Sequence, residues 1–141
     1  MAPTVLLFHG CGGIRPQMAH YAEAAVRLGV RAVVVDSYAP RGWSRAFAMT
    51  AVCTGAMFWG RERAGDVLAA AWGAVQDLGA DPNRLVLAGF SHGAWSIMDL
   101  MTMPLQRTGE AGLLDPSPQS LEGVRGLFLG YAYGGVRTHL R

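Results

Sequence analysis

The stretch of the chain that most constrains its fold is residues 89–93, which have the pattern Gly-x-Ser-x-Gly with Ser91 at the centre. The largely apolar residues 84–88 before it predict a buried strand, and residues 94–101 after it predict a helix. A serine nucleophile is held at this kind of sharp strand-to-helix turn, where larger side chains would collide with the neighbouring strand and helix. The pattern therefore predicts a strained turn that raises the Ser91 hydroxyl above the carboxyl end of a sheet. The alternative is a tight turn whose serine merely caps the helix.

The remaining hydrophobic pattern predicts an α/β fold with a parallel sheet, in one domain of 141 residues. Continuous apolar runs predict four buried strands, and helical spacing of apolar residues predicts helices between them. The predicted strands are residues 4–8, 30–35, 85–88 and 124–133, and the predicted helices are residues 16–28, residues 63–78 and the segment after Ser91. Right-handed crossovers favour the spatial strand order two-one-three-four, with helices flanking the sheet.

The predicted strand order brings two distant stretches together at one site. Residues 10–12 and Ser91 both follow strands that flank the topological switch point, where such sheets bind ligands. Attack of Ser91 on an ester carbonyl creates an oxyanion, which two backbone N–H groups have to hold. We assign one of them to His92 and the other to Cys11 or Gly12, in the glycine-rich loop after the first strand. The alternative for this loop is a generic tight strand-to-helix connection.

Taken together, these motifs resemble the dienelactone hydrolase family of α/β-hydrolases. The resemblance covers roughly residues 3–133, and its matching segments are residues 9–13, 35–42, 63–66, 81–84 and 89–93. It implies a partial α/β-hydrolase core that acts on small carboxylic esters or lactones through an acyl-enzyme, without a cofactor. The family's namesake has a cysteine at the position of Ser91. Many of its esterase-like relatives have a serine there, as this chain does.

The chain departs from this family at both ends. Members have antiparallel strands before the first strand found here, and they place the catalytic acid and histidine after two further strands beyond Tyr133. This chain starts almost directly on its first strand and ends at Arg141. We therefore expect the middle of the fold with both ends missing, and no residue matches the family's acid or base. One alternative hypothesis is thus a non-catalytic hydrolase fragment or a degenerate paralogue.

None of the four histidines is an obvious base for Ser91. We expect the His92 side chain to point away from the serine and to pack, while its backbone N–H serves the site. His9 is expected to pack and hydrogen-bond beside the loop, and His20 to be solvated. His139 would reach the site only by folding back. Without a base the reactivity of Ser91 falls by orders of magnitude, although an oxyanion hole alone retains some catalysis.

A long segment of weak periodicity, residues 37–62, separates the second strand from the next helix. Segments of this length in compact domains are often functional lids or binding loops. We expect Asp36 to order this segment, and Asp66 to pair with Arg63 or with the segment.

A second class of function, dinucleotide binding, also has support in the sequence. Residues 10–15 form a glycine-rich loop after a strand, and Asp36 ends the next strand about twenty residues further on. Arg15, however, stands where the third glycine of that fingerprint belongs, and the turn at Ser91 would have no explanation. Dinucleotide binding is therefore the second hypothesis.

Composition argues against several other classes of protein. The net charge is +2 and the arginines are scattered, so we expect no nucleic-acid partner. The longest apolar runs are only about as long as strands, so we expect no membrane span, and residues 1–8 lack the features of a signal peptide. The spacing of cysteine, histidine and carboxylate residues indicates no metal site.

Two cysteines, Cys11 and Cys53, are too few for a disulfide framework. They could pair, but we expect free thiols and a cytoplasmic location. The outer strands, residues 30–35 and 124–133, would leave open sheet edges, so we also expect the chain to self-associate.

Overall fold

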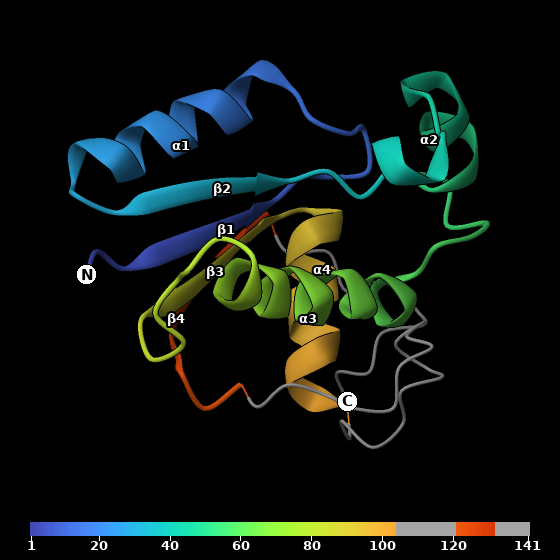
Figure 1. The fold of residues 1–141 in the computed structure, drawn as a ribbon. Helices are drawn as coiled ribbons and strands as arrows, with labels where there is room; N and C mark the ends of the chain where they lie inside the picture. Colours follow the sequence, from blue (N-terminus) through green and yellow to red (C-terminus); the bar gives the residue numbers. More distant parts are fainter. Residues whose placement is uncertain (104–120, 132–141) are drawn as a thin grey trace.

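A four-stranded parallel sheet forms the centre of the molecule, in the spatial order β2-β1-β3-β4 (Figure 1). The computed structural model describes residues 1–103 and 121–131 of the chain. Within these ranges the strands are β1 (Thr4–Phe8), β2 (Arg31–Val35), β3 (Leu85–Phe90) and β4 (Val124–Gly130). Each neighbouring pair is parallel, which confirms the predicted α/β fold and its strand order.

Helices cover both faces of this sheet. In the described residues they are α1 (Pro16–Arg27), α2 (Arg45–Ala51), α3 (Gly60–Gln76) and α4 (His92–Thr102), with a short 3-10 helix, η1 (Ala39–Arg41). The helix α1 packs on one face, whereas α3 and α4 pack together on the other (Figure 1). No helix in residues 1–103 or 121–131 has the length and apolar character needed to cross a membrane.

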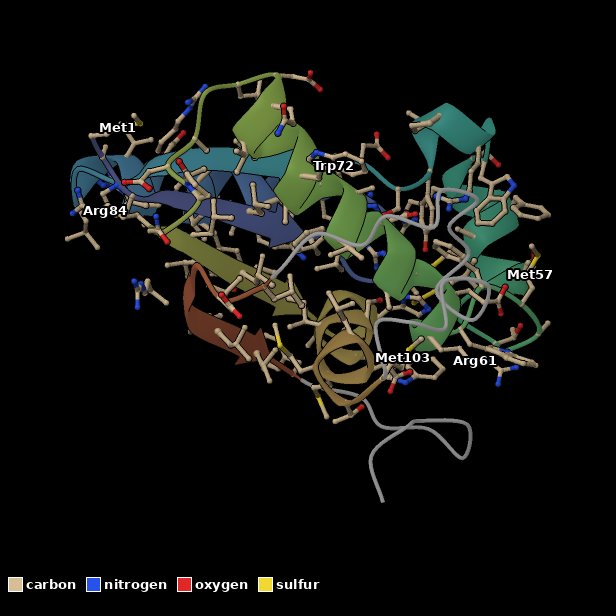
Figure 2. All side chains as sticks on the ribbon, turned by 60° about the horizontal axis from the view of Figure 1, so that its bottom comes forward. Met1, Met57, Arg61, Trp72, Arg84 and Met103 are labelled. Carbon is tan, nitrogen blue, oxygen red and sulfur yellow. A yellow bond between two sulfur atoms is a disulfide. The ribbon has the colours of Figure 1, made fainter. Side chains whose placement is uncertain are left out.

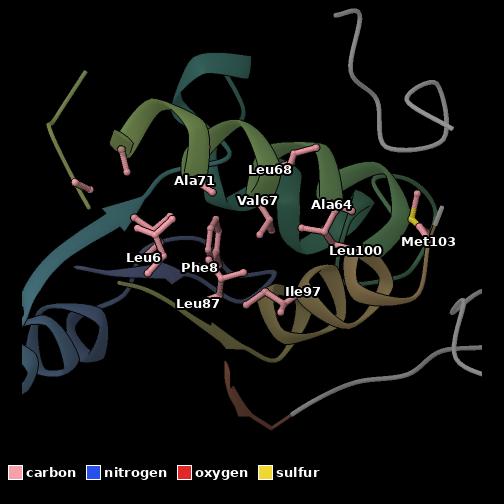
Figure 3. Close-up of a cluster of buried hydrophobic side chains, with 13 residues drawn as sticks. Leu6, Phe8, Ala64, Val67, Leu68, Ala71, Leu87, Ile97, Leu100 and Met103 are labelled. Carbon is pink, nitrogen blue, oxygen red and sulfur yellow. The ribbon is translucent and has the colours of Figure 1, made fainter. Parts of the chain in front are cut away.

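The central strand β1 supplies side chains to two separate cores, because successive residues of a strand point to opposite faces. Figure 3 shows the larger core, in which Leu6 and Phe8 meet Val67 of α3 and Ile97 of α4. On the other face, alternate residues of β1 pack with α1 around Met18. All five residues of β1 are buried, as expected for a strand in the middle of a covered sheet.

The segment between β2 and α3 is more regular than its sequence predicts. Ser44 begins α2, because its side chain accepts a hydrogen bond from the Phe47 N–H at 3.1 Å. Ala48 and Val52 then pack in a third, smaller core with aromatic side chains of the same segment. Burial against its own aromatic residues thus stabilises a helix that has weak periodicity.

Some predicted bounds of α3 and β4 need correction. The helix α3 begins at Gly60 rather than near residue 63, and it ends at Gln76. Leu78, predicted to lie on its apolar face, is 46% exposed because the chain has already left the helix. It turns away through Gly79, whose φ is +65°. The strand β4 ends at Gly130, so Tyr131 lies beyond it. Predictions for residues 104–120 and 132–141, including His139, lie outside the described residues.

Cys11 and Cys53 form a disulfide, so the prediction of free thiols is wrong. The loop after β1 and the chain just beyond α2 meet here, with the two Cα atoms 5.2 Å apart. The approach depends on how residues 37–62 fold back over the loop, which the spacing of two cysteines in sequence does not indicate.

The two ends of the sheet differ in what they carry. Arg84 donates a hydrogen bond to the Met1 carbonyl at the amino end of the strands (Figure 2). Met57 and Arg61 lie at the opposite end, toward which β1 and β3 run (Figure 2). The loop after β1 and the turn after β3 therefore share the end of the sheet where ligands bind in α/β folds.

Candidate active site

Ser91 occupies a strained turn between β3 and α4. Its φ is 53° and its ψ is −110°, a conformation that residues other than glycine rarely adopt. The Ser91 N–H donates to the Gly130 carbonyl at 2.8 Å, and the Ser91 carbonyl accepts from the Trp95 N–H at 3.0 Å. Hydrogen bonds on both sides of the residue thus hold the strained backbone in place.

The two glycines of the motif allow this turn for the steric reason that the sequence predicts. A Cβ atom built on Gly89 would lie 2.5 Å from the carbonyl carbon of Gly93. One built on Gly93 would lie 2.3 Å from the carbonyl oxygen of Phe8. Both distances are far below van der Waals contact, so β1, β3 and α4 approach one another here only because both positions are glycine.

The loop after β1 lies directly against the turn. Phe8 is in register with Gly89, so the next residues of both strands emerge side by side. A Cβ atom built on Gly10 would lie 3.5 Å from both the Cβ atom of Ser91 and the carbonyl oxygen of Phe90. The structure therefore brings together the two stretches from which the sequence analysis builds one site.

Hydrogen bonds to carbonyl groups orient two peptide units of this loop. The Gly10 carbonyl accepts from the His9 ring at 2.7 Å and from the Gly13 N–H at 3.1 Å, and the Cys11 carbonyl accepts from the Tyr38 hydroxyl at 2.7 Å. In a trans peptide the N–H points away from the carbonyl, so the N–H groups of Cys11 and Gly12 face away from these partners. Within the described residues, neither N–H has a hydrogen-bond acceptor.

The third candidate N–H belongs to His92, the first residue of α4. The first N–H groups of a helix have no partner within the helix and carry partial positive charge. The candidate site thus has donors on two elements, the loop after β1 and the start of α4.

Both buried histidines are structural, as the sequence analysis expects. The His9 ring accepts from the Ser37 N–H through Nε2, and the His92 ring donates from Nε2 to the Phe58 carbonyl at 2.8 Å. Burial, followed by the nearby charge of Arg63, lowers the pKa of His9 to about 4 and that of His92 to about 3. Both rings are therefore neutral at pH 7 and bonded away from Ser91. The third described histidine, His20, is exposed on α1.

The two aspartates act on the segment after β2. Asp36 accepts from the N–H groups of Tyr38 and Ala39 at 2.9 and 3.0 Å, which orders the start of the segment as predicted. Asp66 forms two hydrogen bonds of 2.8 Å with the Arg41 guanidinium. Asp66 therefore pairs with the segment after β2, one of its two predicted partners, and not with Arg63.

Sequence reasoning missed the roles of Tyr38 and Arg63. Arg63 is fully buried and contacts the residues that flank both halves of the site. A signal for its burial was present, because Arg63 precedes Val67 and Ala71 at intervals of four on the apolar face of α3. No local pattern marks the contact of Tyr38 with Cys11, which depends on the fold of the segment.

A pocket of about 210 Å³ opens beside the loop, between it and the segment after β2. Its lining combines backbone at the loop with aromatic and charged side chains; the lining residues are Gly12, Gly13, Ile14, Asp36, Tyr38, Ala39, Trp43 and Arg45. Across residues 1–103 and 121–131 there is no group of three or more side chains that could hold a metal ion. The pocket borders Gly12 of the loop, and its lining does not include Ser91.

Neither models of known protein families nor curated proteins show a match to this chain. What is established is the α/β fold with a four-stranded parallel sheet. The resemblance to dienelactone hydrolases stays a prediction from the sequence motifs.

Proposed function

We propose that this chain is a serine hydrolase of the dienelactone hydrolase type, with Ser91 as the acyl-forming nucleophile. The proposed substrates are small carboxylic esters or lactones. The observation that carries the proposal is the strained Ser91 turn packed directly against Gly10 of the loop after β1. A serine that only capped a helix would need neither the positive φ nor the close approach of that loop.

The proposed reaction has two steps. The Ser91 oxygen attacks the carbonyl carbon, the carbonyl π electrons move to its oxygen, and the N–H groups of His92 and of Cys11 or Gly12 hold the resulting oxyanion. Solvent water takes the Ser91 proton. Collapse of the intermediate then breaks the bond to the alcohol oxygen, which leaves with a proton from water, and an acyl-serine ester remains. Water then attacks the same carbon, which releases the acid and restores the serine.

The proton that leaves Ser91 needs an acceptor, and the described histidines do not supply one. His9 and His92 are bonded elsewhere, and His20 lies on α1, whereas His139 is outside the described residues. We therefore expect slow turnover from this chain, supported by the oxyanion donors alone.

Two observations favour this proposal over dinucleotide binding. The Oδ1 atom of Asp36, the residue that would have to bind a ribose hydroxyl, accepts two backbone N–H groups and so orders the segment after β2. The glycines at positions 89 and 93 are explained by the turn at Ser91, which has no part in a dinucleotide site.

A cytoplasmic location stays a proposal. The Cys11–Cys53 disulfide argues against it, because disulfides seldom persist in reducing compartments.

The test is labelling by a fluorophosphonate, followed by intact-mass spectrometry. We expect one phosphonyl group per chain, and we expect Ser91→Ala to abolish its addition. Ser96→Ala is the matched control, because Ser96 lies one turn further along α4, where its hydroxyl is buried and donates to the His92 carbonyl at 2.9 Å. Labelling that survives Ser91→Ala would overturn the assignment, and a wild-type chain that never labels would favour the non-catalytic fragment.

A further inference from the structure

Arg63 is a buried cation at the start of α3, with a side chain that reaches under the candidate site. It is 0% exposed. Its Nε donates to the Ser37 hydroxyl at 3.1 Å, and its Nη1 contacts both the His9 carbonyl at 2.7 Å and the His92 Nδ1 at 3.1 Å. Within the described residues, its Nη2 has no hydrogen-bond partner.

Within the described residues, Arg63 forms no direct ion pair with a carboxylate. The two nearest candidates are engaged elsewhere, since Asp66 pairs with Arg41 and Asp36 binds backbone N–H groups. Burying an uncompensated cation is strongly unfavourable, and an apolar side chain of similar size is often more stable at such a position. Burial lowers the pKa of Arg63 to about 10, so the side chain is still charged at pH 7. Stability alone therefore does not explain an arginine here.

The contacts of Arg63 join the two halves of the proposed oxyanion hole. His9 immediately precedes the loop that carries the Cys11 and Gly12 N–H groups, and His92 is the residue after the nucleophile. One guanidinium nitrogen binds the backbone of the first and the ring of the second. The rigid guanidinium of Arg63 thus sets the distance between the N–H groups in the loop after β1 and the N–H group at the start of α4.

We propose that Arg63 is a positioning residue of the oxyanion hole, and that its buried charge also stabilises the negative charge that develops there. This inference rests on the proposed function of Ser91. A buried charge acts on a developing oxyanion more strongly than the same charge at the surface, because little solvent screens it. Arg63 itself touches no substrate.

The test separates the charge from the hydrogen bonds by means of two variants. Arg63→Lys keeps a cation with fewer hydrogen-bond donors, and Arg63→Gln keeps hydrogen-bond donors on a shorter, neutral side chain. For both variants and wild type, phosphonylation of Ser91 is followed by intact mass over a range of probe concentrations. This gives a maximal labelling rate and a half-saturating concentration, and urea unfolding gives the stability of each protein.

We expect Arg63→Gln to lower the maximal rate by about tenfold or more, with the half-saturating concentration little changed. Arg63→Lys should retain a clearly higher rate than Arg63→Gln, irrespective of which variant is more stable. Equal rates for the two variants, or a higher rate for Arg63→Gln than for Arg63→Lys, would overturn this inference. So would an Arg63→Lys chain that does not fold, because Arg63 would then be required for the fold itself rather than for the oxyanion hole.

The outcome also distinguishes this inference from the proposed function. If Ser91→Ala does not abolish labelling of the wild-type chain, the proposed function fails and this inference fails with it. If labelling depends on Ser91 but not on the charge at position 63, only this inference fails.

Discussion

Gly10 and Ser91 lie next to each other, so that a Cβ atom built on Gly10 would be 3.5 Å from the Cβ atom of Ser91. One follows β1 and the other follows β3, and these strands are neighbours although α1, β2, α2 and α3 separate them in the chain. This proximity depends on the parallel sheet beneath it and on the two glycines that let α4 approach β1.

The closest approach in the site is that of Gly93 to the Phe8 carbonyl oxygen, which a Cβ atom would meet at 2.3 Å. We expect Gly93→Ala to lower the free energy of unfolding by about 3 kcal/mol, because α4 has to move away from β1. Gly73→Ala is the control, since Gly73 lies in α3 and its nearest contact would be an aspartate oxygen at 3.6 Å. That variant should gain about 0.5–1 kcal/mol in urea unfolding. Equal effects of the two substitutions would contradict the steric account of the turn.

The Cys11–Cys53 disulfide closes a loop with a sequence separation of 42 residues. By loop-closure entropy, its loss should lower the free energy of unfolding by about 4 kcal/mol. Unfolding in urea with and without reductant measures this for the wild-type chain. The Cys11→Ser/Cys53→Ser double variant should match the reduced wild type and should not respond to reductant. A wild-type chain whose stability is indifferent to reductant would show that the cysteines do not pair in solution.

Two buried neutral histidines make the stability depend on pH. The pKa values of His9 and His92 are about 4 and 3 in the folded chain, against 6.5 for a free histidine, because of burial first and the Arg63 charge second. Below pH 6.5 the unfolded chain therefore binds more protons than the folded chain, and the free energy of unfolding falls as the pH falls. The slope should approach about 1.4 kcal/mol per pH unit for each histidine.

Urea unfolding between about pH 6.5 and pH 5 measures this slope while most carboxylates stay charged. His20→Asn is the control, because it removes an exposed histidine and leaves both buried rings in place. His9→Asn should reduce the slope by about half, since one of the two buried rings is then absent. A flat profile for the wild-type chain would mean that these rings are accessible to protons in the folded state.

The outer strand β4 has only β3 as a neighbour within the described residues, and its apolar side chains are exposed. We propose that the chain self-associates through such an edge, because unpaired backbone groups beside apolar side chains favour pairing with another strand. Phe128→Lys, at a position that is 55% exposed, should shift the mass found by light scattering toward the monomer. Leu28→Lys, at a position that is 83% exposed at the end of α1, should not. A monomeric wild-type chain would refute the proposal.

The sheet and the turn at Ser91 could be predicted from sequence because both depend on local signals. Each strand is a continuous apolar run, and crossover handedness leaves few orders for such strands. The glycines at positions 89 and 93 directly indicate a turn that is too tight for a Cβ atom at either position. These signals do not depend on how distant segments fold.

The disulfide, the contact of Tyr38 with Cys11 and the burial of Arg63 could not be predicted with the same success. Each depends on the tertiary fold of residues 37–62, whose helix α2 is stabilised by packing rather than by periodicity. A charged residue on an apolar helix face looks like an exception to the pattern until its partners are known. The features that surround Ser91 are thus set by contacts made far along the chain.

The most direct measurement of the central claim is a crystal structure of the chain after reaction with a phosphonate. We expect phosphorus bonded to the Ser91 oxygen, with the phosphonyl oxygen within about 3 Å of the His92 nitrogen and of the Cys11 or Gly12 nitrogen. A phosphonyl oxygen that points into solvent, or phosphorus bonded to any other side chain, would contradict the account.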